Sequence, residues 1–136
     1  MHVIPYLFFN GRSREAIAFY KDAIGITDEM VMRFGDSPEQ AGVPPENKDL
    51  VMHAQFKVGD TTIFMSDGCG GGETKFEGSA LAIAADTVPD AQRIFDALAK
   101  GGKVTQPLTE TFFAKIFGMV QDKFGMHWML SVSKPM

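Results

Sequence analysis

The chain has 136 residues, of which 45% are hydrophobic and 22% charged, and this is typical of one globular domain that folds without a disulfide or a structural metal. A single cysteine excludes an intramolecular disulfide, and a net charge of −4 with no run of Lys and Arg argues against a nucleic-acid partner. Because no apolar run approaches the roughly 20 residues that span a bilayer, and because the start MHVIPYLFFNGRSRE lacks the basic region of a signal peptide, we expect a soluble, cytoplasmic protein with no membrane partner.

The first half begins with a short apolar strand in VIPYLFF (3–9) and a helix in SREAIAFYKDAIG (13–25). Ser13 is placed to cap this helix, and Gly25 to end it. The segment 35–49, GDSPEQAGVPPENKD, is a long polar loop that serves as a lid over a pocket, a dimer contact or plain surface. The following segment, LVMHAQFKV-GD-TTIFMSD (50–67), predicts a hairpin, because Gly-Asp between two apolar runs is a favourable two-residue turn.

The second half follows a glycine-rich stretch, DGCGGGETKFEG (67–78). A glycine-rich run cradles phosphate when a helix N-terminus follows it, whereas here a strand follows, so the stretch is interpreted as a linker. Cys69 within it has no partner cysteine and no activating base nearby in the sequence, so we assign it no catalytic role. Beyond it, ALAIAA (80–85) predicts a strand, DTVPDAQRIFDALAKGG (86–102) a helix with Pro89 in its first turn, and AKIFGMVQ-DKFG-MHWMLSV (114–132) a second hairpin.

The two halves share one pattern. The apolar stripes of the two helices superimpose with an offset of 75 residues, which pairs Ala16, Phe19, Tyr20, Ala23 and Ile24 with Ala91, Ile94, Phe95, Leu98 and Ala99. The order of elements predicts an α+β fold of two tandem βαβββ modules, against the alternative of two unrelated α+β halves. We expect one domain, 1–136, with module 1 at about 1–67, the linker at about 68–78 and module 2 at about 79–136.

Three segments carry a resemblance to a known family: PYLFFNGRSREAIAFY (5–20), VMHAQFKVGDTTIFMSD (51–67) and VQDKFGMHWML (120–130). They resemble the vicinal-oxygen-chelate superfamily, which includes glyoxalase I, extradiol dioxygenases and bleomycin-binding proteins. Within it they resemble the PhnB-like branch, also labelled 3-demethylubiquinone-9 3-methyltransferase-like. The resemblance implies the glyoxalase/bleomycin resistance fold, in which the modules form a curved mixed sheet around a cavity with the helices outside, and it implies a homodimer.

Metal-dependent members of the superfamily place one His, Glu or Gln on each of four strands. The resemblance puts four other residues at these positions: Pro5 (or its neighbour Tyr6), Met65, Ser79 (or Ala80) and Met129. Proline has no side-chain donor, and a thioether suits Cu(I) rather than a harder divalent ion. We therefore expect no metal and no other cofactor, with Met65 and Met129 as an apolar, adaptable part of the cavity wall.

A metal site can also be rebuilt from relocated ligands, for which the candidates are His53, Asp67, Glu110 and His127. A two-residue Gly59-Asp60 turn pairs residues whose numbers add up to 119. Strand alternation then places Asp67 on the face of Met65 and His53 on the opposite face, away from the expected cavity.

Asp67 and His127 are the two candidates for acid–base work or for binding a polar group of a substrate, because His127 shares a strand face with Met129. The alternatives are that Asp67 is a strand-end residue bonded to a backbone N–H and that His127 is a surface or hydrogen-bonded histidine.

The aromatic residues on or beside the strands favour a flat or apolar ligand, against the alternative of ordinary packing. The predicted cavity lining is Tyr6, Phe8, Met65, Asp67, Phe113, Phe117, Trp128 and Met129. The expected function is that of a PhnB-like protein that binds a small molecule, with its specific activity open. The alternative is a divalent-metal-dependent enzyme of the glyoxalase or dioxygenase type that uses relocated ligands. A methyltransferase, as the family label has it, is not supported, because the linker glycines lead into a strand.

Overall fold

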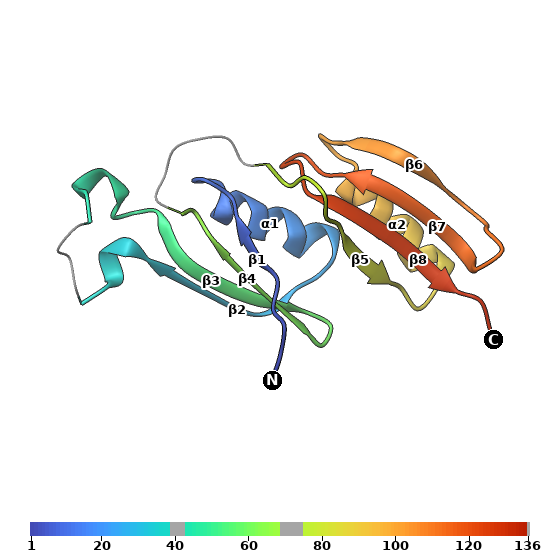
Figure 1. Ribbon diagram of the computed structural model, residues 1–136, viewed down its shortest axis with the longest axis horizontal. Helices are drawn as coiled ribbons and strands as arrows, with labels where there is room; N and C mark the ends of the chain where they lie inside the picture. Colours follow the sequence, from blue (N-terminus) through green and yellow to red (C-terminus); the bar gives the residue numbers. More distant parts are fainter. Residues whose placement is uncertain (39–42, 69–74, 136) are drawn as a thin grey trace. The chain divides into compact units, whose positions relative to one another are not determined.

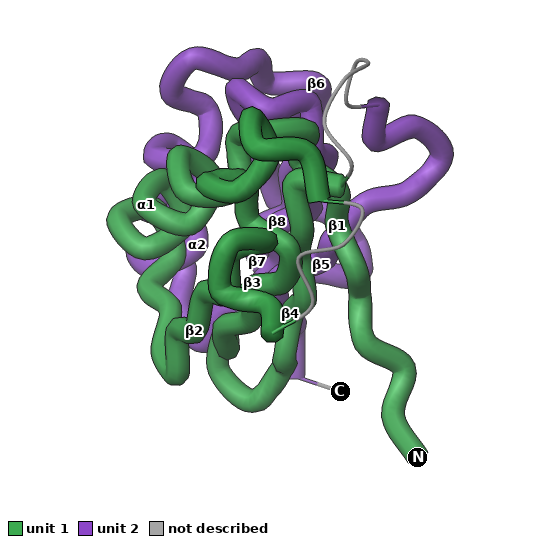
Figure 2. The backbone as a smooth tube through the Cα atoms, turned by 90° about the vertical axis from the view of Figure 1, so that its left-hand side faces the viewer, with its two compact units in different colours: residues 1–74 green, residues 75–136 purple. Residues whose placement is uncertain are grey.

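The computed structural model describes residues 1–38, 43–68 and 75–135, and it divides into two compact units, Met1–Thr74 and Lys75–Met136 (Figure 2). Cys69 and most of the predicted linker, residues 69–74, lie outside the described residues, as does the middle of the long polar loop, residues 39–42. None of the helices in the described ranges is long and apolar enough to cross a membrane.

The first unit is a four-stranded sheet with one helix (Figure 1). Its strands lie in the order β1-β4-β3-β2, with β1 parallel to β4 and the other neighbours antiparallel. Two short 3-10 helices lie in the loop between β2 and β3. The elements are β1 (Tyr6–Phe8), α1 (Ser13–Ala23), β2 (Thr27–Arg33), η1 (Phe34–Asp36), η2 (Pro45–Asn47), β3 (Val51–Val58) and β4 (Thr61–Ser66).

The second unit repeats this arrangement, with the strand order β5-β8-β7-β6 and β5 parallel to β8. Its elements are β5 (Leu81–Ala84), α2 (Val88–Leu98), β6 (Lys103–Thr109), β7 (Ala114–Gln121) and β8 (His127–Ser133). Helices α1 and α2 start 75 residues apart, at the offset of the apolar stripes. The predicted α+β fold of two βαβββ modules is confirmed, as two separate four-stranded mixed sheets with one helix each.

The two helices begin differently. Thr87 caps α2 through its side-chain oxygen, which accepts a hydrogen bond from the Asp90 N–H at 3.2 Å, and Pro89 lies in the first turn as predicted. The prediction that Ser13 caps α1 is wrong. The Ser13 backbone N–H donates instead to Oδ1 of Asp67 at 2.9 Å, so a carboxylate from the end of β4 does the capping.

One face of the first sheet is covered by α1. Val31 of β2 lines a hollow together with Ile17 of α1, and in the sheet Val31 pairs with Ala54, which in turn pairs with Met65. Paired residues point to the same side of a sheet, so this row faces the helix. We call the other side, which carries Tyr6, Phe8, His53, Gln55 and Phe64, the open face of the first sheet.

The second sheet is likewise covered on one side by α2. A Cβ atom on Gly118 of β7 would lie 3.0 Å from Cε2 of Phe95, so Gly118 faces the helix. Gly118 pairs with Leu130 of β8, and the buried residues of β8 are Trp128, Leu130 and Val132. We call the opposite side, which carries Phe117, Met119, His127 and Met129, the open face of the second sheet.

Candidate functional site

An aromatic cluster lies on the open face of the first sheet. The Tyr6 and Phe8 rings stack with their centroids 5.1 Å apart, and Phe64 meets Tyr6 edge to face at 5.8 Å. The imidazole of His53 lies 4.8 Å from the Phe64 ring and 5.6 Å from the Tyr6 ring. Tyr6 and Phe8 keep 41% and 54% of their surface exposed, so this cluster is an accessible apolar surface and not a packed core.

A chain of polar groups crosses the same cluster. The Tyr6 hydroxyl lies 3.0 Å from Nδ1 of His53, and Nε2 of His53 lies 3.4 Å from Oε1 of Gln55. The amide oxygen of Gln55 can only accept, so in the tautomer with the ring proton on Nε2, His53 donates to Gln55 and its Nδ1 accepts from the phenol. The phenol proton is thereby directed at His53, while the lone pairs of the Tyr6 oxygen can still accept a hydrogen bond from a ligand.

The open face of the second sheet carries its own aromatic group at the start of β7. Phe113 meets Phe117 edge to face at 5.4 Å and Phe112 at 5.2 Å. Phe112 and Phe113 are 93% and 52% exposed. Further along the same face, Met119 of β7 pairs with Met129 of β8.

His127 pairs with Gln121 and shares the open face with Met129, as the alternation predicted. The assignment of His127 as a catalytic candidate stays a prediction.

The structure corrects the faces assigned to two predicted cavity residues. Met65 is fully buried and lies in the row that faces α1, and Trp128 is buried on the side of α2. The indole N–H of Trp128 donates to Oδ2 of Asp122 at 2.8 Å, which fixes this ring in the core. Both side chains pack on the helix side of their sheets, and neither reaches an open face.

Asp67 is held by the backbone. Its Oδ1 accepts from the N–H groups of Gly11 and Ser13 at 3.0 and 2.9 Å, and its Oδ2 accepts from the N–H of Val51 at 2.8 Å. Only 3% of the residue is exposed. This carboxylate joins β4, β3 and the start of α1, which agrees with the structural alternative that the sequence left open.

Of the four residues that the resemblance puts at metal-ligand positions, Met65 lies on β4 and Met129 on β8, whereas Pro5 and Ser79 lie just outside the strands. On the open faces β1 and β4 pair Tyr6 with Phe64, and β5 and β8 pair Ala82 with Met129. Pro5 uses its carbonyl to accept from the Phe64 N–H at 2.9 Å, and Ser79 is exposed ahead of β5. These side chains do not form the nitrogen, oxygen and thiolate donor set that a divalent ion needs.

Relocated ligands do not converge within either unit. Glu110 forms an ion pair at 3.4 Å with Lys134, beyond the end of β8, whereas His127 begins that strand, and seven residues of strand span about 23 Å. Among residues 1–38, 43–68 and 75–135 no group of three His, Cys, Asp or Glu side chains could hold a metal ion. We therefore derive no chemistry through a metal.

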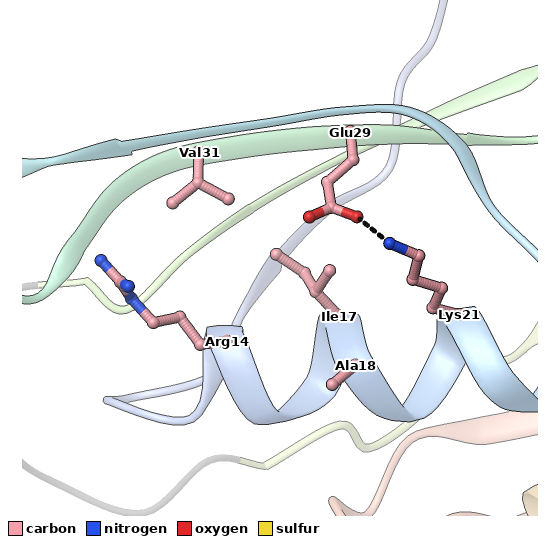
Figure 3. A pocket seen from close by; sticks show the side chains of 6 residues that line it. All are labelled: Arg14, Ile17, Ala18, Lys21, Glu29 and Val31. Atoms are coloured by element: carbon pink, nitrogen blue, oxygen red, sulfur yellow. Dashed lines mark hydrogen bonds and ion pairs between the residues drawn. The ribbon is translucent and has the colours of Figure 1, made fainter.

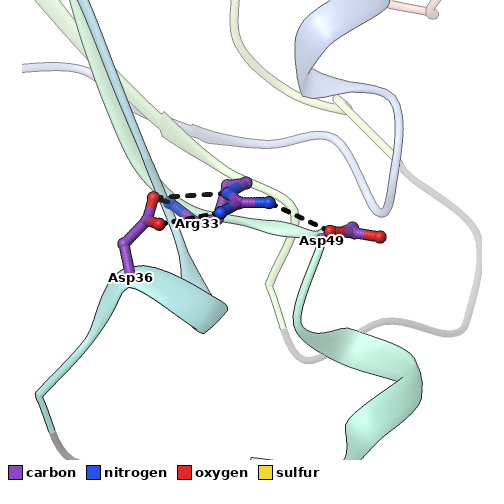
Figure 4. Close-up of polar contacts among 3 residues, drawn as sticks. All are labelled: Arg33, Asp36 and Asp49. Atoms are coloured by element: carbon purple, nitrogen blue, oxygen red, sulfur yellow. Dashed lines mark hydrogen bonds and ion pairs between the residues drawn. The ribbon is translucent and has the colours of Figure 1, made fainter.

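A charged cluster closes the base of the long polar loop (Figure 4). The Arg33 guanidinium bonds both carboxylate oxygens of Asp36, at 2.9 and 3.3 Å, and one oxygen of Asp49 at 3.1 Å. Hydrogen bonds from the Arg33 side chain and backbone lower the pKa of Asp36, and the hydrogen bond to Asp36 raises the pKa of Arg33. The cluster ties the end of β2 to the residues just before β3.

Sequence reasoning missed Gln55 and Phe64 as members of a site, and it placed His53, a candidate metal ligand, on the face away from the expected cavity. The signal was available, because the predicted register, in which paired numbers add up to 119, is the register of β3 and β4 from Ala54–Met65 to Val58–Thr61. The predicted pairing of β3 with β4 is right. The prediction of which face of this sheet is free of the helix is wrong. With the faces exchanged, the same alternation gathers His53, Gln55 and Phe64 beside Tyr6.

Comparison with known proteins agrees with this architecture. A sequence model of the family described as 3-demethylubiquinone-9 3-methyltransferase matches residues 1–131. The protein YjdN of Escherichia coli K12 is 34% identical over 142 residues, which cover 98% of this chain and 97% of YjdN. The crystal structure of protein PA1353 from Pseudomonas aeruginosa has 37% sequence identity and a TM-score of 0.85, and the match covers 99% of both chains.

A more distant structure shows the fold alone. The PhnB protein from Bacillus cereus has 24% sequence identity and a TM-score of 0.79, and the match covers 98% of this chain and 100% of that one.

Proposed function

Because the chain belongs to the 3-demethylubiquinone-9 3-methyltransferase family, in the PhnB-like branch of the vicinal-oxygen-chelate superfamily, we propose that it binds a small, flat, largely apolar molecule on the open face of the first sheet. The observation that carries the proposal is the accessible cluster of Tyr6, Phe8 and Phe64 around a hydrogen-bonded His53.

The rings supply the apolar part of the site. Exposed aromatic surface gains free energy when a ligand removes it from water, and ring-to-ring contacts add about 0.5–1.5 kcal/mol beyond the area buried. Because the rings already pack against one another, a ligand has few side-chain rotations to freeze when it binds. Stacking on Tyr6 and Phe8 favours a planar ligand over a branched one.

The polar chain supplies orientation. With the phenol proton directed to His53, the Tyr6 oxygen accepts, and the preferred ligand carries an O–H or N–H group beside its ring. The family's label names a methyltransferase, and the residues that we describe give it no support. At the turn between β1 and α1, the N–H groups of Gly11 and Ser13 that could hold a cofactor already donate to Asp67.

The proposal is tested with a thermal-shift screen of planar aromatic compounds, followed by calorimetry of the compounds that bind. Phe8→Ala should weaken binding about tenfold or more, since a stacked aromatic contact and its buried area are lost. Tyr6→Phe should weaken compounds with an O–H or N–H group about tenfold and leave compounds without one unchanged. The control is Phe112→Ala in the second unit, which removes a ring that is still more exposed than Phe8, 93% against 54%. Binding that survives Phe8→Ala, or that Phe112→Ala weakens equally, overturns the proposal.

Two further proposals follow from the family resemblance. We propose that the protein works without a metal, for which elemental analysis of untagged protein after exposure to Mn²⁺, Ni²⁺, Zn²⁺ and Fe²⁺ and dialysis is the test. Near-stoichiometric metal that survives dialysis would contradict this proposal and support the alternative, a metal-dependent enzyme with relocated ligands. We also propose a homodimer, which sedimentation equilibrium at micromolar concentration tests, and a chain that sediments as a monomer at all concentrations contradicts it.

A further inference from the structure

A concave surface lies in the first unit between α1 and the sheet (Figure 3). It lies on the helix side of the sheet, whereas the aromatic cluster lies on the open face. It is a groove of about 310 Å³ between α1 and the edge strand β2, and we call it the α1–β2 groove. Its lining residues are Arg14, Ile17, Ala18, Lys21, Glu29 and Val31. The volume is at the lower end of the range for small-molecule sites.

The sequence spacing explains why these residues meet. Residues 14, 17, 18 and 21 follow the i, i+3, i+4, i+7 pattern that forms one face of a helix. Glu29 and Val31 are two apart on β2 and point to the helix side, while Met30 between them points to the open face. The register of β2 against β3 is irregular between Thr27 and Met30.

The two cations of the groove, Lys21 and Arg14, differ in their ion pairing. Lys21 forms an ion pair with Glu29 at 3.4 Å, so its charge is largely matched. Within the described part of the chain, no hydrogen bond or ion pair holds the guanidinium of Arg14. Its influence is seen at longer range, because the pKa of Asp36 is lowered chiefly by Arg33 and only to a smaller extent by Arg14. The groove therefore has one unmatched cation in a chain of net charge −4.

An apolar surface adjoins this cation. Figure 3 shows Ile17 on the helix between Arg14 and Lys21, with Val31 facing it from β2. Lys21 follows Arg14 by seven positions on the helix, a rise of about 10 Å, which is the length of a short aryl or alkyl chain. We propose that the α1–β2 groove binds small amphipathic carboxylates, with the carboxylate on Arg14 and the apolar body on Ile17 and Val31.

This site is independent of the proposed function, because it lies on the helix side of the sheet and shares no residue with the aromatic cluster. A substitution in the groove should leave binding on the open face unchanged. Failure of one proposal therefore leaves the other standing.

The test is a titration of the ¹⁵N-labelled full chain with 3-phenylpropanoate, followed by amide chemical shifts. Saturable shifts are expected at Arg14, Ile17, Ala18 and Val31, and the neutral alcohol 3-phenylpropan-1-ol should bind about tenfold more weakly, because it cannot form a charge-assisted hydrogen bond. Shifts scattered over the surface, or equal affinity for acid and alcohol, overturn the proposal.

Four variants sharpen the test. Arg14→Gln should weaken the acid about tenfold, whereas Glu29→Gln should tighten it about two- to fivefold, since it removes a negative charge and releases Lys21. Ala18→Leu should abolish binding, because a larger side chain fills the groove while keeping a good helix former on α1. Arg93→Gln on α2 is the matched control. Equal losses in Arg14→Gln and Arg93→Gln, or weaker binding in Glu29→Gln, contradict the assignment.

The same carboxylate chemistry occurs in free acids and at the C-terminus of a peptide. A pentapeptide ending in phenylalanine and N-acetylphenylalanine distinguish the two sources, with the amidated peptide as the uncharged control. Tighter binding of the peptide assigns the groove to chain ends, and tighter binding of the amino-acid derivative assigns it to free acids. Equal binding of the amidated and the free peptide refutes the requirement for a carboxylate.

Discussion

Replacing Asp67 by alanine tests whether this residue is structural or catalytic. The change leaves the N–H groups of Gly11, Ser13 and Val51 without their acceptor. Gly11 is exposed, so water can replace the lost oxygen there, but the bonds to Ser13 and Val51 are buried. A buried donor left unpaired costs about 1–3 kcal/mol, and the lost charge at the start of α1 adds about 0.3–1 kcal/mol.

With two such donors, the expected loss in the free energy of unfolding is therefore about 2–7 kcal/mol, a large part of the roughly 5–15 kcal/mol that holds a typical domain together. Asp67→Asn should cost less, about 1–3 kcal/mol, because one oxygen remains while the new amide points an N–H at a backbone N–H. Urea unfolding followed by far-UV circular dichroism measures both values.

The control for this experiment is Asp86→Ala, which removes an exposed carboxylate and should change stability by less than about 0.5 kcal/mol. The reasoning is refuted if Asp67→Ala unfolds within about 1 kcal/mol of the unmodified chain, below the cost of one unpaired buried donor. It is also refuted if the variant keeps its stability and loses ligand binding, since that result would mean that Asp67 takes part in ligand binding.

Two further predictions concern charge and capping in the first unit. Ser13→Ala should leave the free energy of unfolding unchanged or raise it, because the Ser13 hydroxyl is buried without a hydrogen-bond partner in the described structure, and a loss of about 1 kcal/mol would show that it caps α1 after all. The lowered pKa of Asp36 means that its pairing with Arg33 stabilises the fold above the pKa of the unfolded state and is lost as the pH falls through the folded pKa, below about pH 4. A carboxyl ¹³C titration should therefore show the pKa of Asp36 rising toward its ordinary value in Arg33→Gln, which keeps the backbone hydrogen bond from residue 33. An unchanged pKa there would show that the Arg33 side chain is not the cause.

The helices were predictable because their signals are local. An apolar stripe at helical spacing placed α1 and α2 in the right segments, and the offset of 75 residues that relates them is the offset of the stripes. Pro89 and Gly25 act where the sequence puts them, Pro89 in the first turn of α2 and Gly25 with a φ of +88° just after α1.

The cap of α1 was not predictable from local sequence. The acceptor of the Ser13 N–H is Asp67, which lies 54 residues later in the chain. A local cap and a distant one leave the same sequence signature at the helix, namely a small polar residue before an apolar stripe. Only the pairing of β1 with β4 brings the distant carboxylate to the turn before the helix.

The candidate site depends on which face of its strand each side chain points to, and the sequence predicts the wrong face for Met65. The sequence assigns both Met65 and Met129 to the cavity wall, and each lies six residues after a turn residue, Gly59 and Lys123. The first hairpin is closed by two residues, Gly59 and Asp60, whereas β7 and β8 are paired up to Gln121 and His127, which leaves five residues in the second turn.

Two and five differ by an odd number, and a shift by an odd number of residues moves a side chain to the other face of a strand. Met129 therefore lies on an open face and Met65 faces a helix. The counterpart of Met129 in the first unit is Phe64, since Phe64 pairs with Tyr6 of β1 as Met129 pairs with Ala82 of β5. The two open faces thus differ in chemistry at equivalent positions, an aromatic ring beside Tyr6 in one unit and a thioether beside Ala82 in the other, and this difference favours the first sheet for a planar ligand.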